Sequence, residues 1–85
     1  MLMSGRRRLC DIAPGERARV FSVSEKSAIS RRLCDLGLIR NTVVECIMKS
    51  PLGDPTAYLI RGAVIALRKE DAAFVTVEVI SDGAD

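Results

Sequence analysis

Three cysteines, Cys10, Cys34 and Cys46, are the residues of this 85-residue chain with the most reactive side chains. The sequence holds no histidine, which removes the commonest general base and the commonest metal ligand together. Structural zinc usually takes four ligands with paired spacings, and three unpaired cysteines with a stray carboxylate make a poor set. We therefore expect no metal and no cofactor. We interpret Cys34 and Cys46 as small core residues and leave open whether Cys10 is exposed.

Motifs for nucleophilic and phosphate chemistry are missing as well. A serine nucleophile needs a neighbouring base that the sequence does not supply. The segment Leu52-Gly53-Asp54 has one glycine and is not a phosphate-binding loop. We therefore do not expect an enzyme. An odd number of cysteines without C-x-x-C spacing favours a reducing compartment over a disulfide framework.

Charge is distributed unevenly along the chain. The net charge is +2, with 48% hydrophobic residues. Without Arg6–Arg8 and the two C-terminal aspartates, the chain has ten basic and nine acidic residues. This near-neutral charge is unfavourable for binding nucleic acid. The start MLMSGRRRL has no apolar signal core, and no apolar run approaches the ~20 residues that span a bilayer. We expect a cytoplasmic protein with one domain over residues 9–80, a flexible basic tail at 1–8 and a flexible acidic tail at 81–85.

One short helix is predicted, at about Ser27–Leu36. Ile29, Leu33 and Leu36 fall at i, i+4 and i+7, which makes one apolar stripe. Ser27 is the expected N-cap. Gly37 can take the left-handed conformation that ends a helix, with Leu38 folding back onto Leu33.

The rest of the chain has the pattern of short strands separated by turns. The predicted strands are Arg17–Val23, Thr42–Lys49, Thr56–Arg61, Val64–Arg68 and Phe74–Ile80. Within Thr42–Lys49 we place Val44, Cys46 and Met48 on one face. Gly62 indicates a tight hairpin, and RKEDAA a helical turn before the last strand. Together these elements predict a mostly β fold, a small closed barrel of five strands with the helix inserted after the first.

The segment Pro51-Leu52-Gly53-Asp54-Pro55 predicts a stiff loop. Each proline fixes its own φ and restricts the residue before it, and Gly53 permits the chain reversal. Asp54 is expected to accept hydrogen bonds from loop amides. Leu52 then lies at the crest, either folded onto the barrel or exposed as a docking residue with little entropy to lose on binding.

Three stretches together resemble the FeoA family: LCDIAPGERARV, RRLCDLGLIRNTVVEC and SPLGDPTAYLIRGAVIALRKEDA. The resemblance covers Leu9 to about Ile80. It implies an SH3-like barrel that serves as a non-catalytic cytoplasmic accessory protein of bacterial ferrous iron uptake, with no iron ligands of its own. It also implies binding to the FeoB permease or its GTP-binding domain, and a place at the membrane only through that partner. Family members commonly have Pro-Gly where this chain has Arg40-Asn41, and Asn can take the same backbone conformation.

The candidate partner-binding residues lie in two segments. They are Leu36, Gly37, Leu38, Pro51, Leu52, Gly53, Asp54 and Pro55.

An alternative function stays open at this point, because the barrel also resembles a domain of iron-responsive repressors. In that case the chain would be a regulatory module that acts with an iron-dependent transcription regulator. A third function, as a small-molecule or iron chaperone, is poorly supported without histidine.

Overall fold

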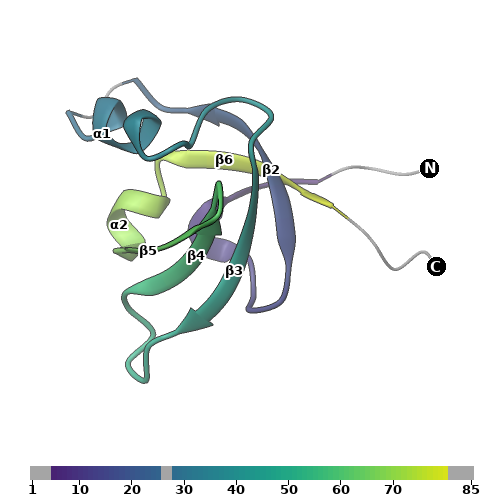
Figure 1. Cartoon of the computed structure of the whole chain (residues 1–85), viewed down its shortest axis with the longest axis vertical. Coiled ribbons are helices and arrows are strands. Elements are labelled where there is room, and N and C mark those ends of the chain that lie inside the picture. Colours follow the sequence, from purple (N-terminus) through teal and green to yellow (C-terminus); the bar gives the residue numbers. More distant parts are fainter. Residues whose placement is uncertain (1–4, 26–27, 81–85) are drawn as a thin grey trace.

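The computed structural model describes residues 5–25 and 28–80 of the chain. Six antiparallel strands form one sheet in the order β1-β6-β2-β3-β4-β5 (Figure 1). The strands are β1 (Arg6–Arg8), β2 (Arg17–Val23), β3 (Val43–Lys49), β4 (Thr56–Ile60), β5 (Ala63–Leu67) and β6 (Val75–Ile80). The helices are the 3₁₀ turn η1 (Leu9–Asp11), α1 (Ser30–Asp35) and α2 (Lys69–Ala72). The predicted mostly β class is therefore confirmed.

The sheet differs from the predicted barrel in strand number and in closure. It has a sixth strand, and in the described part of the chain β1 and β5 remain its two edges. Closure was expected because bare apolar edges invite unwanted pairing. One edge is instead protected by charge, since β1 consists of three exposed arginines.

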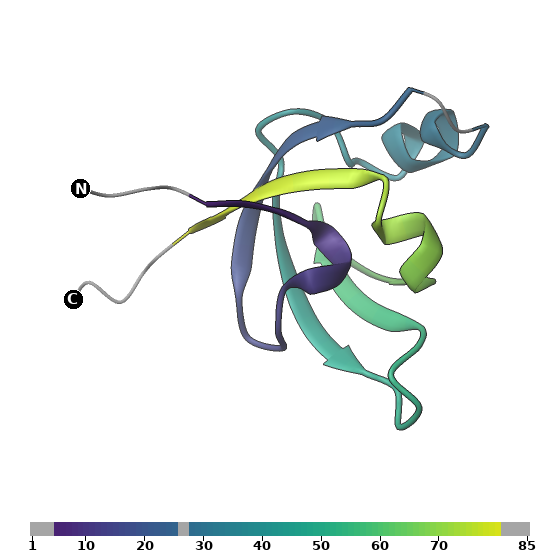
Figure 2. The same ribbon diagram turned by 180° about the vertical axis from the view of Figure 1, so that it is seen from behind.

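The arginines Arg6–Arg8 belong to the sheet, so the prediction that they form a flexible tail is wrong. They pair with Glu78, Val77 and Thr76 of β6 (Figure 2). Ion pairs at 3.2 Å join Arg6 to Glu78 and Arg8 to Asp11. The strand forms because β6 offers an open edge, which the sequence of the arginines cannot reveal. The expected tail residues 1–4 and 81–85 lie outside the described residues.

The core lies between the curved sheet, η1 and the two α-helices. Its fully buried side chains are Leu9, Ile12, Val20, Leu33, Leu38, Val44, Cys46, Tyr58, Ile60, Val75 and Val77. The predicted inward positions Val44 and Cys46 are confirmed. Met48 is 59% exposed, against the prediction. A register shift in the β3–β4 pairing between Cys46 and Met48 breaks the alternation of faces there.

The helix α1 is shorter than predicted but ends as predicted. Gly37 has φ +109°. Its N–H donates to the Cys34 carbonyl at 2.9 Å, and the Leu38 N–H donates to the Leu33 carbonyl at 3.0 Å. These are the two bonds of a Schellman cap, and Leu33 and Leu38 are both buried beneath it. The expected N-cap, Ser27, lies outside the described residues.

Two tight turns also follow the sequence. Arg61 and Gly62 join β4 to β5 with φ of 51° and 85°, the positive pair that suits a two-residue hairpin. Asn41 has φ 76°, as expected for a residue replacing glycine. The helical turn before the last strand is α2.

Candidate functional site

The loop between β3 and β4 is held in one shape by backbone hydrogen bonds. The Gly53 N–H donates to the Ser50 carbonyl at 2.7 Å, and the Ser50 N–H donates to the Pro55 carbonyl at 3.1 Å. Gly53 has φ +87°, which permits the reversal. Leu52 at the crest is 94% exposed, so it is not folded onto the sheet.

Asp54 fixes the loop to a different element from the one expected. Its Oδ1 accepts a 2.7 Å hydrogen bond from the N–H of Lys69, the first residue of α2, whereas bonds from loop amides were predicted. A carboxylate at a helix N-terminus satisfies one of the amides that lack an intrahelical partner. The loop is thereby attached to the helix that follows β5.

Exposed apolar side chains occur both on the loop and on β3, the strand that leads into it. Met48, two residues before Ser50, is also exposed, and we call Met48 and Leu52 the tip patch. The patch exists because the irregular β3–β4 register turns Met48 outward and the loop bonds hold Leu52 away from the sheet. Sequence reasoning found Leu52 but placed Met48 inside.

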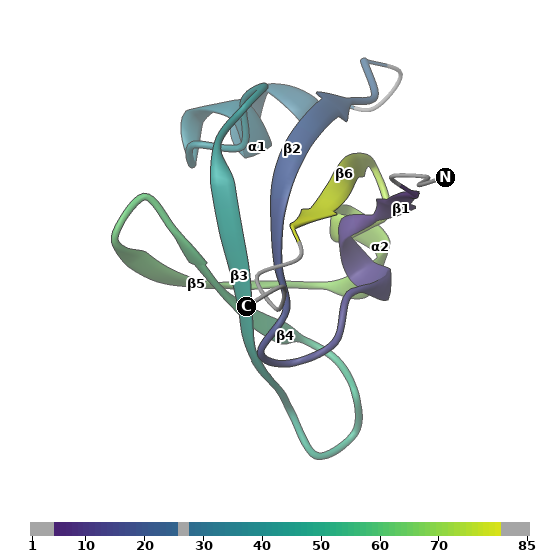
Figure 3. The same ribbon diagram turned by 90° about the vertical axis from the view of Figure 1, so that its right-hand side faces the viewer.

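The second candidate segment does not join this surface. Gly37 and Leu38 are buried, and Leu36 is half-buried. The views in Figures 1 and 3 place α1 and the β3–β4 loop at opposite ends of the molecule, whose longest extent is 38 Å. Leu38 and Gly37 therefore build the helix end, and the loop residues Pro51–Pro55 remain as one local candidate surface.

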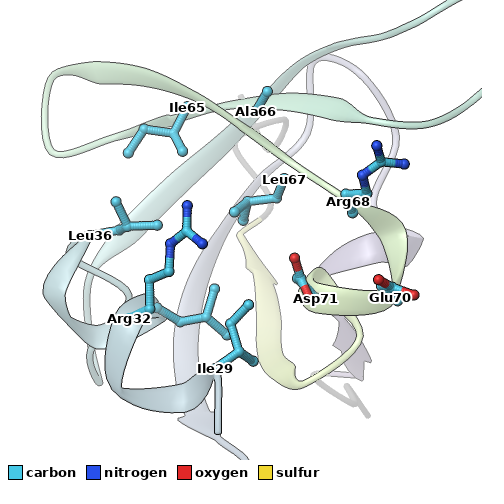
Figure 4. Close-up of a pocket in the computed structure, with 10 residues that line it drawn as sticks. Ile29, Arg32, Leu36, Ile65, Ala66, Leu67, Arg68, Glu70 and Asp71 are labelled. Atoms are coloured by element: carbon cyan, nitrogen blue, oxygen red, sulfur yellow. The ribbon is translucent and has the colours of Figure 1, made fainter. Parts of the chain in front are cut away.

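A groove lies between α1, β5 and α2, which sequence reasoning missed (Figure 4). Its volume is about 350 Å³. Apolar walls come from Ile29, Leu36 and Ile65, while Arg32 on α1 and Asp71 on α2 stand at its two sides. The groove gathers residues from three elements that lie up to about forty positions apart, so no local motif could have indicated it.

Two of the three thiols are buried. Burial raises the pKa of the Cys10 thiol, with a further contribution from Asp11, and burial likewise raises the pKa of Cys46. Cys34 is exposed because it follows Leu33 and so points about 100° away from the apolar stripe. The prediction for Cys46 is confirmed and that for Cys34 is wrong. Among residues 5–25 and 28–80, no three Cys, Asp or Glu side chains gather as a metal site.

Tyr58 links β4 to η1 inside the core. Its hydroxyl donates to the Leu9 carbonyl at 3.3 Å. Burial raises the pKa of this phenol far above its ordinary value of 10.0.

In the part of the chain that the structure describes, no helix has the length and apolarity to cross a membrane.

Comparisons with known proteins give a consistent result. The family model described as FeoA domain matches residues 7–79. A fusion of Fe(2+) transport protein A with the Fe(2+) transporter FeoB from Porphyromonas gingivalis is 31% identical over 77 residues, which are 91% of this chain and 9% of that protein. This chain thus spans about a tenth of the length of that relative.

Solved structures share the fold over most of their length. A FeoA-like protein from Clostridium acetobutylicum is 30% identical with a TM-score of 0.87, covering 94% of this chain and 93% of that one. FeoA from Stenotrophomonas maltophilia, described as an SH3 domain protein complexed with zinc, is 31% identical with a TM-score of 0.74, covering 82% and 87%. The SH3-like class expected from the sequence is therefore confirmed.

A manganese-dependent transcriptional repressor and IdeR also show this architecture. The structure of IdeR from T. acidophilum is 21% identical with a TM-score of 0.78, and the match covers 94% of this chain and 37% of that one. At this identity the likeness concerns the fold alone. The match to the FeoA domain, by contrast, extends over nearly all of the described residues, and on that ground the chain belongs to the FeoA family.

Proposed function

We propose that this chain is a non-catalytic, cytoplasmic accessory protein of ferrous iron uptake that binds a FeoB-type permease or its GTP-binding domain. The observation that carries the proposal is the exposed Leu52 on a loop held by three hydrogen bonds. The fusion relative supports the choice of partner, since its name combines both proteins in one chain.

The loop suits docking because its shape is set before a partner arrives. The loop backbone is fixed by Ser50 and Gly53 at its base and by Asp54 against α2, so little conformational entropy is lost on binding. Burial of one leucine side chain contributes about 1.5–3 kcal/mol. Met48, four residues earlier in the chain, is a second exposed apolar side chain. We expect a small and transient interface, because an 85-residue domain has little surface to offer.

The test is binding of the full chain to the intact permease in lipid nanodiscs, in the nucleotide-free, GDP-bound and GTP-analogue-bound states. Replacing Leu52 by Ala should weaken binding about tenfold to a hundredfold. Leu52→Asp should abolish it, because a carboxylate would enter an apolar site. Both variants should keep the stability of the parent within about 0.5 kcal/mol, since the residue is exposed.

Ile39→Asp is the matched control. Ile39 is 45% exposed and follows Leu38 at the end distant from the loop, so the same substitution should leave affinity unchanged. Parent affinity in Leu52→Asp would remove the loop from the interface. Absence of binding by the parent chain in every nucleotide state would reject the proposed function itself.

A further inference from the structure

We propose that the free edge of β5 is a second interaction surface, and that it binds an extended strand of the permease by adding it to the sheet. The inference rests on the proposed function for the identity of the partner. The strand that fits has uncharged side chains at its centre and a carboxylate at the end that lies beside Arg32. Four features of the edge and its surroundings support this.

The two edges of the sheet are built differently. The β1 edge carries Arg6–Arg8, and charge on an edge discourages pairing with other chains. The β5 edge has the sequence AVIAL, without charge, proline or glycine. Val64 is 65% exposed, and Ala66 is exposed as well. In the described residues the β5 edge is thus the one left open to pairing.

The hairpin register identifies the backbone groups that the edge offers. Ile60 pairs with Ala63 across the two-residue turn, and such a pair exchanges both hydrogen bonds. Alternation then directs the N–H and C=O groups of Ile65 and Leu67 toward β4, and those of Val64 and Ala66 away from it. In the described part of the chain, no backbone bond outside the sheet involves Val64 or Ala66. An incoming strand would find two donors and two acceptors there.

The groove beside the edge gives the strand a charge preference. Figure 4 shows Arg32 reaching from α1 toward β5, and Asp71 on α2 at the opposite side. Among the described residues neither side chain takes part in an ion pair. A carboxylate on the added strand would neutralise Arg32 at the α1 side. The α1 side of the groove therefore favours a carboxylate on the added strand.

A second copy of this chain fits the edge less well. Pairing of Val64 and Ala66 with their own counterparts requires an antiparallel strand centred on Ile65. That register places Arg68 of each copy beside the Arg61 turn of the other, at both ends of the strand. Like charges opposed across a strand pair are destabilising. The loop proposed to bind the permease is also attached to the helix that follows β5, because Asp54 accepts a hydrogen bond from the N–H of Lys69, which begins α2.

The test measures amide hydrogen exchange of the full chain by mass spectrometry, with and without the intact permease in nanodiscs. The segment followed is 61–68. Permease should slow exchange in this segment. Val64→Lys should weaken binding about tenfold or more, since a lysine on the edge displaces the added strand. Val43→Lys is the matched control, because Val43 is also exposed but lies on β3, which is paired on both sides. It should change affinity less than about twofold.

A second variant of the edge tests the inference independently, in case Val64→Lys fails to fold. Ala66→Pro removes an outward N–H without touching the β4 bonds and should lower affinity to a similar extent. Arg32→Glu should weaken binding as well and should change the salt dependence. Binding without slowed exchange at 61–68, together with parent affinity in Val64→Lys, would overturn the edge inference and leave the proposed function standing. Slowed exchange that depends on the chain's own concentration, without permease, would assign the edge to a second copy and also overturn it.

Discussion

Substitution of Gly37 by Ala tests whether the end of α1 is locked against the β4–β5 turn. Gly37 has φ +109°, and an added Cβ would lie 2.6 Å from Cδ of Arg61 and 3.2 Å from Cγ2 of Ile60. The aliphatic stem of Arg61 therefore packs directly on the glycine. Because α1 and β5 are two walls of the groove, this contact fixes the spacing between them.

The expected cost has two parts. A side chain at positive φ costs about 1–2 kcal/mol, and crowding of a packed contact costs about 1 kcal/mol more when the obstacle is a flexible side chain. Gly15→Ala isolates the first part, since Gly15 has φ +91° with nothing within 4 Å of an added Cβ. We expect Gly37→Ala to cost about 1 kcal/mol more than Gly15→Ala, a further loss of about 4–8 °C in Tm.

Urea unfolding followed by circular dichroism measures both costs, with a double-mutant cycle for the contact. Arg61→Ala combined with Gly37→Ala should recover at least about 0.5 kcal/mol relative to the sum of the single variants. The crowding from Ile60 remains in the double variant, so recovery should be partial. Equal costs at Gly37 and Gly15, with additive single variants, would refute the close approach of Arg61.

Three further predictions concern the buried groups and the thiols. Stability should fall as pH rises above about 9, because burial raises the pKa values of the Cys10 and Cys46 thiols and of the Tyr58 phenol, and the unfolded chain therefore releases these protons first. Cys46→Ala should flatten the decline of the urea midpoint between about pH 8 and 10. An unchanged slope would contradict this account. Iodoacetamide added to the folded chain should label Cys34 well before Cys10 and Cys46, as read by peptide mass spectrometry, and equal labelling of all three would refute the assigned burial. Tyr58→Phe should lower the free energy of unfolding by about 0.5–1.5 kcal/mol in urea titrations at neutral pH, since the Leu9 carbonyl loses the Tyr58 hydroxyl and keeps only the Ile12 N–H as a donor. Parent stability in this variant would show that the hydrogen bond from Tyr58 contributes nothing.

The sequence by itself determined the features that depend on neighbours along the chain. The apolar stripe of α1, its end at Gly37 and the hairpin at Arg61–Gly62 follow from rules that act over a few residues. The stiff loop around Leu52 follows from the same kind of rule. These rules predicted the mostly β class and five of the six strands.

Tertiary structure decided what depends on distant partners. Arg6–Arg8 became a strand because β6 offered an open edge, and Met48 became exposed through a register shift against β4. Asp54 found its hydrogen-bond donor fifteen residues away, in α2. Leu36–Leu38 and the Leu52 loop came to lie at opposite ends of the molecule, and the groove formed from three separate elements. Local rules fix backbone conformation, but a surface consists of whichever side chains long-range packing leaves uncovered.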